Sequence, residues 1–388
     1  MLSRRGFLQS SLLALAPTVP VFVARTALAA PTGRDQRLLV VVQLDGGNDA
    51  LNTVIPHGDP TYRRLRPILA VDKKYVVRLT DEAGLHPALR PLDKLFQAGQ
   101  LGILPGVGYP NPNRSHFESM GIWHTARFDK DGRGGHGWIG WALDPAAGSS
   151  YVVGSAVPRA VRGRRSTAVA LNRIEDLLLA DAASAKKAVG PAAGDDLLCF
   201  VRRQTVDAHK TGERLARLTR GGDAGRYPAT GLAGRLKLAA RMLKSDLGAR
   251  VFYTTQGGYD THALQGSTHE DLLAEFATAV AVFFEDLKQA KLADRVSLLA
   301  FSEFGRTIRE NSSAGTDHGT AGVVFLAGPG VKGGLATKMP SLTDLAGGEP
   351  KMTADFRRVY ATVLGDWLGL PGRMALGGNF ERLPLFRG

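Results

Sequence analysis

The sequence predicts an α/β fold with a doubly wound, mostly parallel sheet. Short, continuous apolar runs recur along the chain, as expected of strands that are buried on both faces. Segments with apolar residues at spacings of three and four lie between these runs and indicate amphipathic helices. With 388 residues, of which 44% are hydrophobic, the chain can bury one large core of this kind.

Six apolar runs are the predicted strands. The first, RLLVVVQL, is the longest, and the run over residues 166–171 is the weakest. Because helical patterns alternate with these runs, we expect the strands to pair in parallel through βαβ units. The predicted strands are residues 37–44, 101–107, 166–171, 250–255, 295–301 and 323–326.

Three segments have the periodicity of amphipathic helices, over residues 232–247, 272–287 and 356–367. Residues 175–230 also read as helical, but they are charged and contain no strand pattern. We therefore expect a single domain over residues 30–388, with a helical insertion or cap at 175–230.

The N-terminus matches a twin-arginine export signal. SRRGFL at residues 3–8 precedes an apolar stretch, and ALA at residues 27–29 has the small-x-small form of a cleavage site. We expect a signal peptide over residues 1–29, export by the twin-arginine translocation machinery, and a periplasmic or secreted protein. An uncleaved N-terminal anchor is the alternative. Pro17 and Pro20 interrupt the stretch, so no transmembrane span is expected in the mature chain.

The charge of the chain favours an anionic partner. The net charge is +13, and the first 29 residues contribute three arginines and no acid, which leaves +10 for the rest. The arginines are scattered without interleaved aromatic residues, so no nucleic acid is expected. An anionic small molecule or an envelope polymer fits better. The lone Cys199 cannot form an internal disulfide, in agreement with folding in a reducing cytoplasm before export.

Ionisable or nucleophilic side chains follow the predicted strands, where open α/β sheets bind their ligands. Carboxylates and imidazoles are the usual ligands of Zn²⁺ and Mn²⁺ in hydrolytic sites. Ser115 and His116 come after the second run, in NRSHFESM. We expect one or two divalent ions, Zn or Mn, bound by Asp45, Asp260, His262, Glu303 and His318.

Three of these residues also have a simpler interpretation. Asp45 could form an Asx-turn or cap a helix. Glu303 could pair with Arg306, and His318 could be a hydrogen-bonded loop histidine. Their shared position at the strand ends favours the metal site.

Ser115 has two interpretations. Ser115-x-x-Glu118 matches a capping box at the start of a predicted helix. A helix N-terminus also stabilises anions, so Ser115 is a candidate catalytic nucleophile as well. Arg114 and Arg306 are candidates to bind an anionic substrate group bidentately.

These motifs resemble the DUF1501 family of exported bacterial proteins. The matching blocks are LDGGNDALN, NRSHFESM, GGYDTH, SEFGRT and TDHG, in this order over residues 37–330. The family is similar to the alkaline phosphatase and sulfatase superfamily, which implies an alkaline-phosphatase-like fold. The resemblance implies that Asp45 is the first-strand ligand and Ser115 the nucleophile. It also implies that Asp260 and His262 serve one metal site, Glu303 a second, and His318 is the last histidine.

The resemblance has departures. The superfamily follows its late acid with a histidine, whereas Phe304 follows Glu303 here. His269 could supply a missing ligand from the next helix or lie on the surface. The sulfatase signature, a Cys or Ser before x-Pro-x-Arg, is absent, so formylglycine chemistry is not expected. The expected function is an exported metal-dependent hydrolase of phosphate or sulfate esters. The alternative is a non-catalytic cell-envelope binding protein with the same fold.

The export prediction is testable with Arg4→Lys and Arg5→Lys combined. Because the twin-arginine pair is the recognised feature, we expect the precursor to remain in the cytoplasm. Cell fractionation and the size of the product measure this. Unchanged export of the double variant would contradict the assignment.

Overall fold

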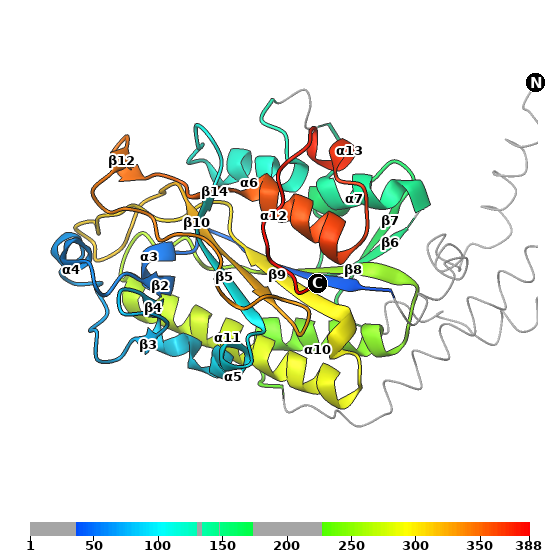
Figure 1. Cartoon of the computed structure of the whole chain (residues 1–388), viewed down its shortest axis with the longest axis horizontal. Helices are drawn as coiled ribbons and strands as arrows, with labels where there is room; N and C mark the ends of the chain where they lie inside the picture. The colour runs from blue at the N-terminus through cyan, green and yellow to red at the C-terminus, as the bar shows by residue number, and fades with distance from the viewer. Residues whose placement is uncertain (1–35, 130–133, 147, 174–226) are drawn as a thin grey trace, which may run out of the picture.

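The protein is built on one nine-stranded sheet with the strand order β11-β5-β10-β9-β1-β8-β6-β7, and β14 also pairs with β5 (Figure 1). The structure is a computed structural model, and it describes residues 36–129, 134–146, 148–173 and 227–388. The expected signal peptide over residues 1–29, Cys199 and all but the end of the expected insertion at 175–230 lie outside the described residues.

All six predicted strands are present. They are β1 (Leu38–Leu44), β5 (Leu101–Gly108), β7 (Thr167–Leu171), β8 (Ala249–Gln256), β9 (Val296–Phe301) and β10 (Gly322–Ala327). A seventh strand, β6 (Ser149–Val153), was not predicted, because the two serines of SSYVV leave an apolar signal of only three residues. The short strands β11 (Gly334–Leu335) and β14 (Ala354–Asp355) both pair with β5.

The sheet is mixed but mostly parallel. Strand β10 is antiparallel to both of its neighbours, β5 and β9, and the other pairings in the sheet are parallel. The amino end of β10 therefore lies at the same edge as the carboxyl ends of β1, β5, β8 and β9. For this reason His318, which precedes β10, is delivered to the edge where the other predicted site residues leave their strands.

Helices cover both faces of the sheet. On one face lie α10 (Gly231–Lys244) and α11 (Gln265–Gln289), which contain two of the three predicted helical patterns. The other face carries α6 (His116–Thr125), α7 (Trp138–Leu143), α12 (Phe356–Thr362), the π-helical turn η6 (Val363–Trp367) and α13 (Arg373–Leu376). Figure 1 shows the two helical layers on opposite sides of the strands.

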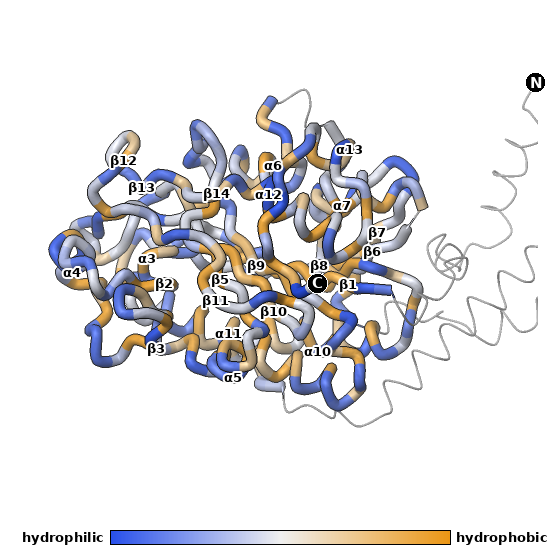
Figure 2. The backbone as a smooth tube through the Cα atoms, viewed as in Figure 1, coloured by the Kyte–Doolittle hydropathy of each residue, from blue (hydrophilic) through white to orange (hydrophobic). Residues whose placement is uncertain are grey.

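The alternation of β1 explains this arrangement. Leu38, Val40 and Val42 pack into the core beneath α10 and α11, whereas Leu39 and Val41 pack into the core beneath α6 and α12. Both faces are apolar, so both need a helical cover. In Figure 2, hydrophobic segments occur both in the strands and in the helices that cover them. The predicted α/β fold with a doubly wound, mostly parallel sheet is confirmed.

The other elements of the described residues are short. Among the described residues, no helix is both long and apolar enough to span a bilayer. The remaining elements are α3 (Ala50–Thr53), β2 (Val54–Ile55), α4 (Pro60–Leu65), β3 (Val77–Arg78), β4 (Gly84–Leu85), η1 (Pro87–Leu92), α5 (Asp93–Gln97), η2 (Asp144–Ala146), η3 (Arg159–Val161), η5 (Ala293–Arg295), β12 (Leu345–Ala346) and β13 (Glu349–Pro350).

A buried ion pair anchors the loops of this edge. The Asp49 carboxylate caps α3 and lies 2.7 Å from Arg66 Nη1, and both side chains are fully buried. Arg66 also donates to the carbonyl oxygens of Thr307 and Ile308, at 2.7 and 3.1 Å. The loop after β1 is thus tied to the loop between β9 and β10, which carries Glu303 and His318.

Gly46 tests how tightly these loops are packed. Its φ of +116° is unfavourable for other residues, and an added Cβ would lie 2.5 Å from the backbone nitrogen of Asp260. We expect Gly46→Ala to lower the free energy of unfolding by roughly 1–3 kcal/mol, or more if the loop cannot shift.

Gly257 provides the matched control. It lies in the adjacent loop, and an added Cβ there would have no atom within 4 Å. Gly257→Ala should therefore unfold within about 0.5 kcal/mol of the wild type. Denaturant unfolding measures the free energy of unfolding of both variants. Equal values would show that the backbone around Gly46 and Asp260 has room for a Cβ atom.

Candidate metal centre

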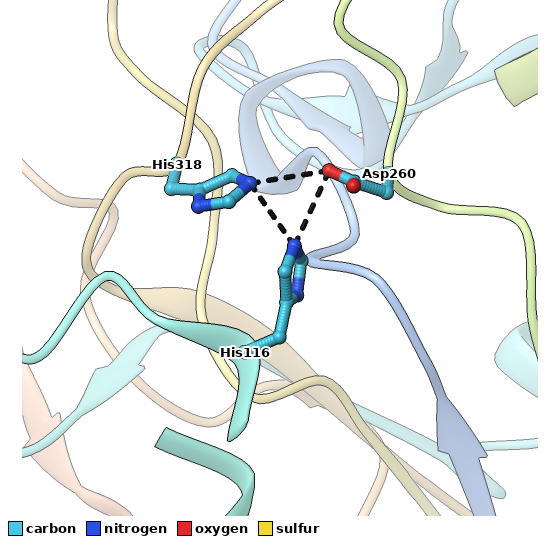
Figure 3. Close-up of side chains that lie close together, drawn as sticks. All are labelled: His116, Asp260 and His318. Carbon is cyan, nitrogen blue, oxygen red and sulfur yellow. Dashed lines mark hydrogen bonds and ion pairs between the residues drawn. The ribbon is translucent and has the colours of Figure 1, made fainter. Parts of the chain in front are cut away.

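Three segments bring imidazole and carboxylate atoms to one point at this edge. His116 is the first residue of α6, Asp260 and His262 lie in the loop after β8, and His318 precedes β10. Figure 3 shows the side chains of His116, Asp260 and His318 pointing toward one another from three different segments. They form the one group of potential metal ligands of this kind that the described part of the chain contains.

The distances fit a shared cation. His116 Nε2 lies 3.0 Å from His318 Nε2 and 3.3 Å from Asp260 Oδ1, and the last two atoms are 3.2 Å apart. His262 Nε2 lies 2.9 Å from both His318 Nε2 and Asp260 Oδ1. Two ligands that each lie ~2.1 Å from one ion cannot be much more than ~4 Å apart, so these contacts are short enough for coordination.

The other ring nitrogen of each histidine faces an oxygen acceptor. His116 Nδ1 lies 2.7 Å from Glu303 Oε1, and His262 Nδ1 lies 3.0 Å from Asp317 Oδ1. His318 Nδ1 lies 2.7 Å from the carbonyl oxygen of Arg114, and because a carbonyl only accepts, this Nδ1 must carry the proton. Such outer acceptors fix the tautomer and the orientation of metal-binding histidines.

Among the described residues, this hydrogen bonding leaves the Nε2 lone pairs of His116 and His318 without donors, whereas His262 Nε2 lies 3.5 Å from Arg306 Nη1. With a proton on each Nδ1, the Nε2 atoms are acceptors in the neutral rings, yet they face one another and a carboxylate at about 3 Å. Such an arrangement is repulsive unless a cation or an extra proton lies among the atoms. Neutral imidazoles with one carboxylate are a donor set that suits Zn²⁺. The residues present therefore fit a divalent metal.

Asp260 is held in its charged form. Burial acts to raise its pKa, but the hydrogen bond and the charge of Arg306 outweigh this and bring the pKa to about 2. Arg306 Nη2 lies 2.6 Å from Asp260 Oδ1. The ligand is thus an anion throughout the physiological pH range.

Arg306 itself is not placed to bind a substrate. Its side chain is fully buried, and its nitrogens donate within the protein. The expected role in binding an anionic substrate group is not supported by this position, because the guanidinium is already occupied. Besides Asp260, its partners are His262 Nε2, 3.5 Å from Nη1, and the carbonyl oxygens of Gly46, Gly47, Tyr259 and Thr316.

Glu303 lies behind His116 rather than in the cluster. Its buried carboxylate accepts from the backbone N–H of Gly46 at 3.0 Å and from Ser302 Oγ at 2.9 Å. The hydrogen bond to Glu303 raises the pKa of His116. The alternative ion pair with Arg306 is not formed, since Arg306 pairs with Asp260. Glu303 therefore orients a ligand, and its predicted direct contact with metal stays a prediction.

Asp45 lies beside the cluster but contributes no atom to it. Its carboxylate accepts from Gln43 Nε2 at 3.0 Å, and Gln43 Oε1 lies 2.9 Å from His124 Nε2. Burial and the nearby charge of Glu303 raise the pKa of Asp45. Asp45 does not cap α3, because Asp49 does so.

Ser115 and Arg114 lie at the exposed rim of the cluster. Ser115 is the N-cap residue of α6, but its side chain makes no capping hydrogen bond, so the expected capping box is not formed by Ser115. Both side chains are exposed, immediately before the ligand candidate His116. This position leaves the Ser115 hydroxyl available for another role.

Two histidines correct the sequence-based expectations. His269 is buried with Nε2 2.9 Å from Asn48 Oδ1, away from the cluster, and burial lowers its pKa to about 4. His116, in contrast, was not expected to be a ligand. Its signal was its position directly after Ser115 at the start of a helix, where the hydroxyl appeared to be the more informative residue.

Metal binding tests the cluster. Because His116 supplies one of three converging ligand atoms, His116→Asn should lower zinc affinity at least about tenfold. Glu303→Gln leaves the candidate ligands intact but removes the acceptor that orients His116, so it should lower zinc affinity about 10- to 100-fold. His136→Asn, outside the cluster, is the control. Elemental analysis after dialysis measures the zinc content of each variant, and titration calorimetry measures its zinc affinity. Equal zinc affinity of His116→Asn and the wild type would exclude the site.

The same titration has a predicted pH dependence. Metal binding requires neutral imidazoles, and Glu303 raises the pKa of His116. Zinc affinity should therefore fall as the pH is lowered through this raised pKa, and the fall should move to lower pH in Glu303→Gln. An affinity that is independent of pH in the wild type would contradict this.

Comparison with known proteins gives weak structural similarities. The C-terminal periplasmic domain of EcEptC from Escherichia coli, in a complex with Zn, is 9% identical, with a TM-score of 0.45 over 88% of this chain and 85% of that one. BT1596, a 2-O GAG sulfatase, is 8% identical, with a TM-score of 0.41 over 90% of this chain and 76% of that one. At these scores the similarity says nothing about the site.

Sequence comparison is more definite. No curated protein matches the chain significantly. A family model described as a protein of unknown function matches residues 107–374, which include His116, Asp260, His262, Glu303 and His318. This is the family that the sequence motifs resemble, and the match covers more than half of the chain. The chain belongs to the DUF1501 family.

Proposed function

We propose that this protein is an exported metal-dependent hydrolase of phosphate or sulfate esters. The observation that carries the proposal is the convergence of His116 Nε2, Asp260 Oδ1 and His318 Nε2 beside an exposed serine. Each histidine is oriented by an outer oxygen acceptor, as expected of a site built to bind metal rather than of loop histidines.

The metal, Zn or Mn, would be held by His116, Asp260 and His318. His262 would be a further ligand, because its Nε2 lies 2.9 Å from both His318 Nε2 and Asp260 Oδ1. When bound, the ion supplies Lewis-acid stabilisation of charge that develops on the ester oxygens. Four protein ligands would fill a tetrahedral shell, so a substrate would bind by expanding the coordination number to five. The geometry supports one ion, because Asp45 and Glu303 lie outside this cluster.

Ser115 is the proposed nucleophile. Its Oγ would form a bond to phosphorus or sulfur as the bond to the leaving alcohol breaks, and the serine proton would pass to solvent or to a nearby base. Water would then release the acid from the serine ester. The N-terminus of α6, a helix of ten residues, favours negative charge at this position. Arg114, which is exposed beside Ser115, is available to pair with the anionic group.

Two exposed apolar residues lie close in sequence to the cluster residues and are candidates to contact the alcohol part of an ester. Phe117 follows His116 and is 80% exposed, and Leu264 follows His262 by two residues and is 77% exposed. Leu264 also has a φ of +45°, which is unfavourable for a leucine. Strained, exposed apolar residues beside a polar site are consistent with contact to an aryl or alkyl group.

Export remains part of the proposal. It rests on SRRGFL and on the small-x-small site near residue 29, and it implies the twin-arginine machinery as a partner and a periplasmic or secreted location. A positively charged chain would suit an anionic substrate, either a small molecule or an envelope polymer.

One observation favours a non-catalytic alternative. Phe304 stands where the resemblance implies a second histidine. The centroid of its ring lies 4.8 Å from the ring centroid of His116 and 5.1 Å from that of His318. An apolar ring at this position removes a ligand for a second ion. A cell-envelope binding protein that retains one metal would show zinc binding without turnover of aryl phosphates, diesters or sulfates.

Ser115 separates these functions. Because Ser115 makes no capping bond, Ser115→Ala and Ser115→Asn should unfold within about 0.5 kcal/mol of the wild type and still bind zinc. Neither side chain can form the serine ester, so turnover of an aryl phosphate should fall at least about a hundredfold.

Ser155→Asn, in the exposed loop after β6, is the matched control and should retain turnover. Aryl phosphate and aryl sulfate hydrolysis measure both rates. Retained turnover in a folded Ser115→Asn protein would exclude the nucleophile role and leave water as the attacking group.

A further inference from the structure

A second charged feature lies in the connection between β6 and β7. Four arginines fall within seven residues, in RAVRGRR at 159–165. From residue 145 to residue 173 the chain contains no aspartate or glutamate. The name arginine strip is used below for Arg159, Arg162, Arg164 and Arg165.

The strip crosses the helical face from one edge of the sheet to the other. Because β6 and β7 are parallel, their connection leaves the edge that carries the metal cluster after Val153 and returns to the opposite edge before Thr167. Midway, η3 packs against α6, the helix that begins with His116. In Figure 1 this connection lies beside α6 and α7. The charges thus extend away from the cluster along the surface.

These arginines have no carboxylate partner among the residues that the structure describes. Arg162 donates only to the carbonyl oxygen of Val157, at 2.7 and 3.1 Å. The Asp144 carboxylate accepts from the backbone N–H groups of Arg164 and Arg165, at 2.9 and 2.8 Å, so among the described residues neither guanidinium group forms an ion pair. The four arginines outnumber the one nearby carboxylate, Asp144, and such an excess of like charge attracts anions.

A cavity lies at the far end of the strip. Its volume is about 500 Å³, and Arg164 and Arg165 form part of its wall. The Arg164 guanidinium lies 5.9 Å from the centre of the Trp141 ring, which also lines the cavity. The other lining residues are Asp144, Pro145 and the exposed Met374. An aromatic side chain beside two guanidinium groups can pack against a sugar ring and pair with its acidic substituents.

We infer that the arginine strip and this cavity bind an anionic polysaccharide. A concave site fits one ring of a chain, whereas a flat bilayer would need protruding side chains. Single-stranded nucleic acid stacks successive bases on several aromatic residues, but Trp141 is the one aromatic residue in the lining of this cavity. The surface does not depend on chemistry at the metal cluster.

Heparin, a sulfated polysaccharide, is the probe. Arg164→Gln combined with Arg165→Gln should weaken binding about tenfold in calorimetry at 0.1 M salt, because two guanidinium contacts are lost. Arg358→Gln combined with Arg382→Gln removes the same charge from a half-buried and an exposed arginine, which already pair with Glu381 and Asp366. This control should bind within twofold of the wild type. Neutral dextran should not bind to any of these proteins.

Several results would overturn the inference. Equal loss in both double variants would mean that heparin senses only net charge. Tighter binding of a single-stranded oligonucleotide or of anionic vesicles, with the same dependence on Arg164 and Arg165, would assign the surface to another partner. If the double variant fails to fold, Arg162→Gln alone should still weaken heparin binding, and an unchanged affinity there would also count against the strip.

Discussion

The buried guanidinium of Arg306 is the interaction on which the site depends. It links the loop after β1, the loop after β8 and the loop before β10 through their carbonyl oxygens, and it pairs with Asp260. A buried cation is costly unless it is fully hydrogen-bonded and paired, and here both conditions are met. The same contacts that satisfy Arg306 therefore hold three segments together and keep the Asp260 carboxylate ionised. Replacing this residue would disturb the geometry and the charge of the cluster at once.

Behind this contact, the site is built in layers. The antiparallel β10 brings His318 to the carboxyl ends of the parallel strands, and the N-terminus of α6 brings His116 to the same place. Oxygen acceptors at each Nδ1 orient the three histidines so that their Nε2 atoms face the cluster. Among these acceptors, the Glu303 carboxylate is buried. The connection between β6 and β7, which carries the arginine strip, leaves the sheet at this edge, and its turn η3 packs against α6.

Much of this could be read from the residues in order. The strands were predicted well because runs such as RLLVVVQL are buried on both faces, which leaves a signal that does not depend on distant contacts. Strand β6 was missed because its burial comes from neighbours and not from its own composition. At the site, Asp260, His262 and His318 were expected and do converge. Their place at strand ends made this predictable, since strand ends of one sheet share an edge.

By itself, the sequence determined the fold class, the family and the edge of the sheet at which polar residues gather, because strand burial and motif order are local properties. Only the tertiary structure decided which of those residues touch. In the structure, His116 belongs to the cluster and Glu303 contacts His116 from outside it. Asp45 contributes no atom to the cluster, and the Arg306 side chain is buried. These roles depend on side-chain direction and on contacts between residues far apart in the chain. A spacing of residues carries no information about them, because a shift of one position along a strand or helix turns a side chain toward another partner.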